Sequence, residues 1–226
     1  MQETIENLTQ KEVEAFTQKV HQATVGALDS IQSATVQKLH PAILHILAEG
    51  RPVAPSELAA VVKLPVKKVA EMLAELPSLE RDEQGCILGF GLTLVPTPHQ
   101  VRLHHHDTSL YAWCAPDALI LPSLIGEQAT ITSPCQATQR QITVEVGKDG
   151  VQQVDPPEAV VSWWLPGMYP NDLRGSGCVN QNLFSSATVA AEWRQAHPGA
   201  TLMSVTDTFR ALTFMSRLSY GGECAA

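Results

Sequence analysis

The chain has 226 residues, 44% of them hydrophobic, which is enough to bury a substantial core in one domain or two small ones. Its net charge of -8 repels the phosphate backbone of nucleic acids, and the sequence shows no locally basic patch. Its longest apolar runs are shorter than the ~20 residues of a membrane-spanning helix, and its first residues lack the pattern of a secretory signal. We therefore expect a cytoplasmic protein with no nucleic-acid partner and no membrane partner.

The five cysteines suit a reducing compartment, where thiols can serve as ligands or nucleophiles. They are Cys86, Cys114, Cys135, Cys178 and Cys224. None stands close to another, so the paired-cysteine signature of a zinc ribbon or a thioredoxin-like motif is absent. A site that uses two thiols must therefore be assembled by the fold.

Residues 1–38 are expected to form a helical arm. Apolar residues recur among Glu, Gln and Lys at spacings near three or four, as in an amphipathic helix. The apolar stripe includes Ile5, Leu8, Phe16 and Val20. This stripe has to be buried, either on the winged-helix-like domain that follows or against a second copy of the chain. Polar residues such as Thr9 and Glu12 interrupt the stricter repeat that a coiled coil needs, so we expect packing within one chain.

Residues 39–99 have the order of elements of a winged helix. Helices are predicted at 42–49, 57–62 and 66–76, followed by a β-rich stretch at 80–95 with a turn at 82–85. Pro41 is predicted to open the first helix and Gly50 to end it, while the hydroxyl of Ser56 is predicted to cap the second.

DNA binding is the obvious alternative role for such a domain, because its third helix would read the groove. In that helix Lys67 and Lys68 are offset by Glu71 and Glu75, which makes a poor surface for phosphates. Since a fold does not imply its commonest function, we favour a structural or substrate-covering role.

Residues 100–226 change to strands and then alternate with helices, which predicts an α+β fold with a mixed α/β domain and antiparallel strands. Strands are predicted at 100–104, 130–133, 142–146, 151–154, 159–165, 178–184 and 202–205, and helices at 188–196 and 207–218. The run of His104, His105 and His106 before Asp107 could bind Zn or Ni, but a polar loop beside a strand is the favoured interpretation.

The most informative segment is 110–126, which reads LYAWCAPDALILPSLIG. Pro116 suits the first turn of a helix, which places Cys114 just before the helix and Asp117 in its first turn. The free N–H groups and the dipole of a helix start stabilise a thiolate and lower the pKa of a cysteine. They also lower the pKa of Asp117, whereas burial would raise it, and the sequence leaves that balance open.

The same segment has a plainer interpretation. Cys114 can be a small buried hydrophobic residue, and Asp117 an ordinary carboxylate at a helix start. Trp113 and Tyr111 either line an apolar pocket beside Cys114 or belong to ordinary core packing. Spacing alone does not separate these alternatives.

The segment closely resembles the active-site segment of organomercurial (alkylmercury) lyases. Further stretches resemble the same family in the same order, so that the resemblance covers roughly residues 40–218. These stretches are 50–53, 89–94, 132–138, 172–178 and 191–194. Motifs of this length in a fixed order are far more specific than an isolated cysteine.

The resemblance implies a winged-helix-like domain packed on a catalytic domain particular to this family, so that the chain divides into an arm at 1–38, a winged helix at 39–99 and a catalytic domain at 100–226. Cys114 and Cys178 match the two catalytic cysteines of the family, and Asp117 matches its catalytic aspartate. Cys135 matches a third cysteine that is usually assigned a structural role. The chain departs from the family in its long arm and at Val179, where some relatives carry a second adjacent cysteine. The other two cysteines match no family site.

The activity that the resemblance implies is protonolytic cleavage of the carbon–mercury bond of alkyl- and arylmercury compounds, giving a hydrocarbon and Hg(II) within mercury detoxification. Mercury is a soft metal that prefers thiolate sulfur, so Cys114 and Cys178 would hold it while Asp117 passes a proton to carbon. No organic cofactor is expected. Mercury is the substrate, cytosolic small thiols are needed for turnover, and mercuric reductase would accept the Hg(II).

Two alternatives come from other classes of protein. A winged-helix metal-sensing transcriptional regulator would couple metal binding by cysteines to release of DNA. A mercury-binding chaperone would keep both cysteines but would not need Asp117, and it would leave an organomercury compound intact.

Overall fold

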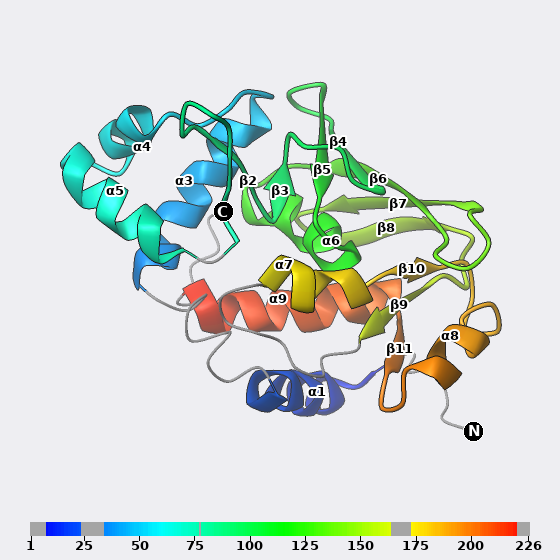
Figure 1. Cartoon of the computed structure of the whole chain (residues 1–226). Coiled ribbons are helices and arrows are strands. Elements are labelled where there is room, and N and C mark those ends of the chain that lie inside the picture. Colours follow the sequence, from blue (N-terminus) through cyan, green and yellow to red (C-terminus); the bar gives the residue numbers. More distant parts are fainter. Residues whose placement is uncertain (1–7, 24–33, 77, 164–172, 221–226) are drawn as a thin grey trace.

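The computed structural model describes residues 8–23, 34–76, 78–163 and 173–220, and Figure 1 shows their arrangement. The helices are α1 (Gln10–Ala23), α3 (Ala34–Ala48), α4 (Pro55–Val61), α5 (Val66–Glu75), α6 (Ala115–Leu124), α7 (Leu173–Ser176), the 3₁₀ turn η1 (Cys178–Asn180), α8 (Ala191–Ala196) and α9 (Val205–Tyr220). The strands are β1 (Glu80–Arg81), β2 (Ile87–Phe90), β3 (Leu92–Thr93), β4 (His99–Leu103), β5 (Thr108–Ala112), β6 (Ala129–Pro134), β7 (Gln141–Gly147), β8 (Gly150–Asp155), β9 (Val160–Trp163), β10 (Leu183–Phe184) and β11 (Thr201–Ser204). Within the described ranges, no helix combines the length and the apolar character needed to span a membrane.

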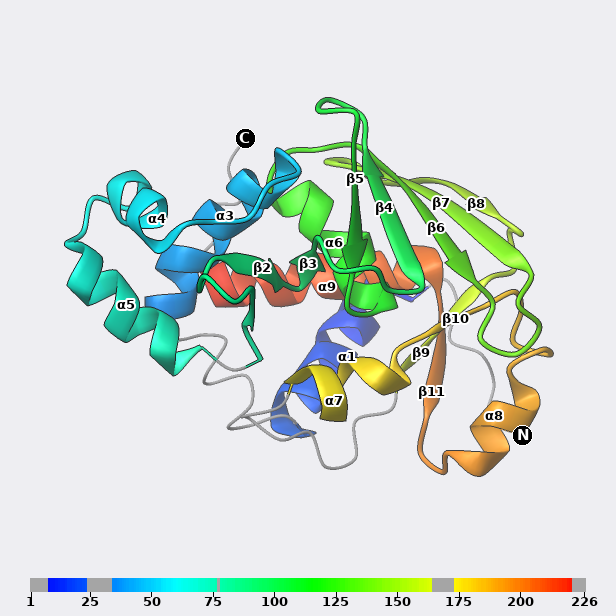
Figure 2. The same cartoon turned by 45° about the horizontal axis from the view of Figure 1, so that its top comes forward.

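The strands form two antiparallel sheets, and the predicted α+β fold class is confirmed. The larger sheet has the order β1-β2-β3-β5-β4-β6-β7-β8, and the smaller one has the order β10-β9-β11. Figure 2 shows α3, α4 and α5 at one end of the molecule and the long strands β4 to β8 at the other, with α6 and α9 between them. Strands β6 and β7 bury alternate residues, as a half-buried sheet requires, and their buried side chains share one core with α6 and α9.

The three helices α3, α4 and α5 and the β1–β2 hairpin follow one another in the predicted order of a winged helix. Val53 adds an isolated antiparallel bridge to Ile87 of the hairpin. These elements enclose a second hydrophobic core that also contains Trp113, the residue before Cys114. The core of the winged helix therefore extends to the segment that carries the predicted site.

The start of α3 differs from the prediction. The helix begins at Ala34, so Pro41 lies inside it and not at its start. Proline has a helix-compatible φ, and the buried residues Leu39 and Ile43 continue one apolar face past it, so packing offsets the lost hydrogen bond. Gly50 ends the helix as predicted, with a φ of 77° that suits glycine.

The start of α4 also differs from the prediction, because its N-cap residue is Ala54 and Ser56 lies inside the first turn. The helix begins at Pro55, two residues before the predicted range of 57–62. Proline is favourable at this position because the first N–H groups of a helix have no partner inside it.

Most predicted strands of the catalytic part are confirmed, and one is wrong. Residues 178–184 form the turn η1 followed by the short strand β10. The side chain of Asn182 donates to the carbonyl of Val179 at 3.1 Å, which stabilises a turn in place of an extended strand. The unpredicted strand β5 pairs with β4, and the polar run 104–107 forms the loop between them, as expected. The predicted strand 159–165 is confirmed as far as Trp163, and its last two residues lie outside the described ranges.

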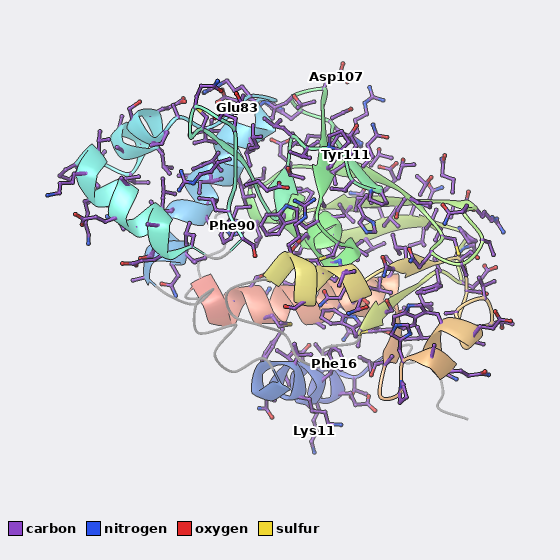
Figure 3. All side chains as sticks on the ribbon, viewed as in Figure 1. Lys11, Phe16, Glu83, Phe90, Asp107 and Tyr111 are labelled. Carbon is purple, nitrogen blue, oxygen red and sulfur yellow. The ribbon has the colours of Figure 1, made fainter. Side chains whose placement is uncertain are left out.

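The helix α1 packs within the chain, on α9 and β9. Val13 is 1% exposed, and the ring of Phe16 meets Trp163 edge-on with centroids 5.4 Å apart. The N–H and the carbonyl of Leu8 both bond to side chains of α9. Figure 3 shows Phe16 on the inner side of α1 and Lys11 on the outer side. Intrachain packing is thus confirmed. The surface that α1 covers belongs to the catalytic part and not to the winged helix, because the apolar residues of α1 share one hydrophobic core with α9 and β9.

Replacing Val13 by alanine should destabilise the protein, because it removes two buried methyl groups from the contact between α1 and α9. We expect the free energy of unfolding, measured by denaturant titration, to fall by about 1–3 kcal/mol. Lys19→Ala, on the exposed side of the same helix, is the matched control and should stay within ~0.5 kcal/mol of the unchanged protein. Equal stability of the two variants would show that α1 does not pack there in solution.

Candidate active site

Cys114 and Asp117 lie at the start of α6, as predicted. Cys114 precedes the first turn with an extended backbone (φ -150°, ψ 171°), and its carbonyl accepts the N–H of Ala118 at 3.0 Å. Pro116 stands in the first turn, where a missing N–H costs nothing. Cys114 is 2% exposed. Ordinary rules of helix initiation therefore place a buried thiol and a carboxyl group at the same end of one helix.

Cys178 reaches this helix end through main-chain hydrogen bonds. The N–H of Ala115, one of the donors left free by a helix start, donates to the carbonyl of Gln181 at 3.1 Å. The N–H of Gln181 donates in turn to the carbonyl of Cys178 at 3.0 Å and closes the turn η1. The hydroxyl of Ser162 on β9 also donates to a carbonyl of this turn, at 2.9 Å. The turn that carries Cys178 is therefore fixed to both α6 and the smaller sheet.

The structure brings the three predicted site residues together. The Sγ atoms of Cys114 and Cys178 and a carboxyl oxygen of Asp117 all lie within 4.8 Å of one another. The Cys178 thiol donates toward Asp117 Oδ2, 3.8 Å away. In the described part of the chain no other group of three or more Cys, His, Asp or Glu ligands comes this close, and the histidines at 104–106 do not form one. Two thiols and one carboxyl group form a site that a soft metal would prefer.

Three further side chains, those of Trp113, Glu80 and Arg174, contact one another next to the segments that carry the two thiols. The Nε1–H of Trp113 donates to Glu80 at 3.0 Å, and Arg174, on the helix just before Cys178, forms an ion pair with Glu80. The guanidinium of Arg174 also lies over the Trp113 ring, 5.7 Å from its centroid. Trp113 meets Phe90 edge-on at 5.8 Å, so core packing describes it better than a pocket wall. Phe90 ends strand β2 of the larger sheet, and Figure 3 shows it near α3, whereas Tyr111 lies on β5 of the same sheet.

Sequence reasoning missed Glu80 and Arg174. Arg174 lay inside a stretch that resembles the lyases, which was the one available signal for it. Glu80 had none, because only the folded chain places its carboxylate beside the other two side chains.

Gly91 lets the main chain approach Asp117 closely. Its φ of 86° favours glycine, and a Cβ atom there would lie 2.5 Å from a methyl carbon of Leu121 and 3.7 Å from the Asp117 carboxyl carbon. The Gly91 carbonyl also accepts the N–H of Trp113 at 2.9 Å. Gly91, the second glycine of the stretch 89–94, therefore helps to enclose the carboxyl group.

Burial controls protonation in this site. It raises the pKa of Asp117 from 3.8 to about 6, although hydrogen bonds from the two thiols oppose the rise. Burial also raises the pKa of Cys114 well above the usual thiol range, and the hydrogen bond with Cys178 and the charge of Asp117 add to the rise. The prediction that the helix start lowers the pKa of Cys114 is therefore wrong, because the approach of the Asp117 N–H opposes the rise but does not overcome it. For Asp117, the balance that the sequence left open falls on the side of burial.

The other described cysteines lie apart from this group. Cys135 is fully buried, and its Sγ accepts the N–H of Ser185 at 3.3 Å. Burial raises the pKa of this thiol, but hydrogen bonds from Thr138 and Ser185 outweigh burial and lower the pKa to about 7. A structural role for Cys135 stays a prediction. Cys86 is partly exposed in the wing, and Cys224 lies outside the described residues.

The raised pKa of Asp117 should make the protein less stable at high pH. A carboxyl group whose pKa is raised by folding stabilises the folded protein fully only at pH values below its ordinary pKa of 3.8. This stabilisation is lost as the pH rises through the folded-state pKa of about 6. Asp117→Asn should therefore be more stable than the unchanged protein at pH 8, by roughly 2–3 kcal/mol. The gap should shrink between pH 6 and 4 in denaturant titrations. A gap that does not change with pH would contradict the burial of this carboxyl group.

Comparisons with known proteins agree with the geometry. The model of the alkylmercury lyase family matches residues 92–215, and the model of the helix-turn-helix domain of alkylmercury lyase matches residues 20–91. The chain is 39% identical over 199 residues to an alkylmercury lyase of Staphylococcus epidermidis, covering 88% of this chain and 89% of the relative. It is 42% identical over 167 residues to one of Pseudomonas putida, covering 74% and 77%. A crystal structure of the mercury-bound form of MerB2 superposes with a TM-score of 0.70 at 25% identity, over 89% of this chain and 98% of that one. The chain belongs to the alkylmercury lyase family.

Proposed function

We propose that the protein cleaves the carbon–mercury bond of organomercury compounds by protonolysis, releasing a hydrocarbon and retaining Hg(II). The observation that carries this proposal is the close approach of two thiols and one carboxyl group, all within 4.8 Å. A soft metal prefers thiolate sulfur as its ligand, and a carboxyl group can give the proton that the departing carbon takes up. The family of the chain supplies the reaction class.

Cys178 is the thiol that meets the substrate first, because it is partly exposed whereas Cys114 is 2% exposed. The substrate arrives as an organomercury ion bound to a small thiol. A bond forms between mercury and the Cys178 sulfur, and the bond to the small thiol breaks. The proton of Cys178 leaves with the released small thiol.

Cys114 then adds to the same mercury and transfers its proton to the carboxylate of Asp117. Each added sulfur donates electron density to mercury and weakens its bond to carbon. The electron pair of that bond goes to carbon, which takes the proton from Asp117 and departs as a hydrocarbon. A carboxyl group with a pKa of about 6 suits this relay, because it can accept and give a proton near neutral pH. Hg(II) remains bound to Cys114 and Cys178, and Asp117 returns to its ionised form.

Turnover requires excess small thiols, which displace Hg(II) and restore the two cysteines. The described cysteines form no disulfide. A reducing compartment such as the cytoplasm would keep their thiols in this reduced form. We propose mercuric reductase as the protein that takes up the Hg(II). Mercury acts as the substrate in this scheme, and no step calls for an organic cofactor.

Family membership disfavours the regulator and chaperone alternatives. In the winged helix, Lys68 of α5 lies 3.8 Å from Glu71, so part of its charge is balanced on the face that would meet DNA. A chaperone would have no use for an acid with a raised pKa between its two thiols.

Cys114→Ala and Cys178→Ala should each lower hydrocarbon release by at least about a thousandfold, because mercury then lacks the second sulfur that activates its carbon. Headspace detection of benzene from phenylmercury with excess thiol measures the effect. Cys86→Ala, which removes a partly exposed thiol in the wing, is the matched control and should keep full activity. Release near the unchanged rate in either site variant would remove that cysteine from the mechanism.

Asp117→Asn should separate binding from cleavage. The amide keeps the shape of the carboxyl group but cannot relay a proton, so hydrocarbon release should fall by about 10²–10⁴-fold. Retention of phenylmercury on the protein, measured as bound mercury after gel filtration, should persist. An active Asn variant would show that the proton reaches carbon by another route.

A further inference from the structure

Gln181, which no sequence motif singled out, is buried beside the reacting thiols. It follows the Cys178 turn and is 7% exposed. Its side-chain Oε1 lies 3.9 Å from the Sγ of Cys114, within the range of a sulfur hydrogen bond. Its backbone is fixed on both sides, by Cys178 and by Ala115. A fixed backbone therefore places a polar side chain next to a proposed nucleophile.

The sulfur of Cys114 needs different partners in its two protonation states. The thiol needs an acceptor for its S–H, and the thiolate needs a donor in a buried place where Asp117 opposes negative charge. A primary amide offers both, because its oxygen accepts and its NH₂ group donates, and rotation about its last bond exchanges them. The amide is uncharged and has no soft ligand atom, so it does not compete with sulfur for mercury.

We propose that Gln181 is a fourth functional residue of the site, whose amide accepts a hydrogen bond from the Cys114 thiol at rest and donates one to the Cys114 thiolate as it attacks mercury. This role rests on the proposed cleavage reaction and adds no proton transfer to it. The proton of Cys114 still passes to Asp117, and the amide keeps both of its own hydrogens. The side chain thus stabilises the ionised nucleophile without contributing charge.

A purely structural role for Gln181 would act through its main chain. The bonds to Ala115 and Cys178 are made by the N–H and the carbonyl of Gln181, so they persist when the side chain is replaced. Side-chain variants therefore separate the two roles.

Two variants of similar shape test the proposal. Gln181→Met removes both the acceptor and the donor, whereas Gln181→Glu, at a pH at which its carboxyl group is ionised, keeps an acceptor, loses the donor and adds negative charge. Asn180→Leu and Asn180→Asp are the matched controls on the same turn, because no hydrogen bond within the described ranges joins the Asn180 side chain to Cys114. The pH dependence of Cys114 modification by methyl methanethiosulfonate, followed by peptide mass spectrometry without mercury, reports ionisation of this thiol.

The midpoint of Cys114 ionisation should rise by about one pH unit in Gln181→Met, and further in Gln181→Glu. Single-turnover benzene release at neutral pH should slow by about tenfold or more in both variants, while Hg(II) is still retained. Both controls should match the unchanged protein. If Gln181→Met does not fold, Gln181→Glu, which preserves the shape of the side chain, decides the matter.

An unchanged midpoint with an unchanged release rate in the Gln181 variants would overturn the proposal. A lower melting temperature with an unchanged midpoint would also overturn it, because it would assign Gln181 a structural role alone. The modification experiment contains no mercury. Failure of the unchanged protein to release hydrocarbon would therefore contradict the proposed function, while the pairing of Gln181 with Cys114 would still be measured.

Discussion

The site depends on the hydrogen bond from the Ala115 N–H to the Gln181 carbonyl, which is 3.1 Å long. A helix start leaves its first N–H groups without partners inside the helix, and here one of them holds the turn that carries Cys178. Because a hydroxyl of β9 also fixes this turn, the second thiol is set beside the first by main-chain contacts. The cysteine side chains themselves remain free to exchange ligands on a metal.

The buried site that this hydrogen bond holds together is unfavourable for negative charge, and the proposed reaction uses that property. Burial raises the pKa of both Asp117 and Cys114, so Cys114 keeps its proton near neutral pH until mercury displaces it, and the Asp117 carboxylate is basic enough to receive that proton. The close main chain at Gly91 and the packing of Trp113 against Phe90 maintain this enclosure. The cost falls on stability, as it commonly does where a protein keeps an active site poised for chemistry.

Sequence rules placed Cys114 and Asp117 at the same helix start, and the resemblance to the lyases identified them as functional residues. Cys178 has no local signal, and only its resemblance to the lyases identified it; the turn that carries it was wrongly expected to be a strand. Glu80 and Gln181 were missed because tertiary packing alone brings them to Trp113 and Cys114. The predicted packing partner of α1 was wrong for the same reason, since an apolar stripe shows that a helix face is buried but does not show which surface buries it.

The carboxyl group of Asp117 is central to the proposed proton transfer, and its titration in the resting protein tests that role most directly. In protein labelled with ¹³C at the aspartate carboxyl carbons, the Asp117 resonance is the one that disappears in Asp117→Asn. We expect its chemical shift to titrate with a midpoint of about 6. A midpoint at or below 3.8 would show that burial does not control this carboxyl group and that its carboxylate is too weak a base to take up the Cys114 proton near neutral pH, and it would contradict the proposed relay.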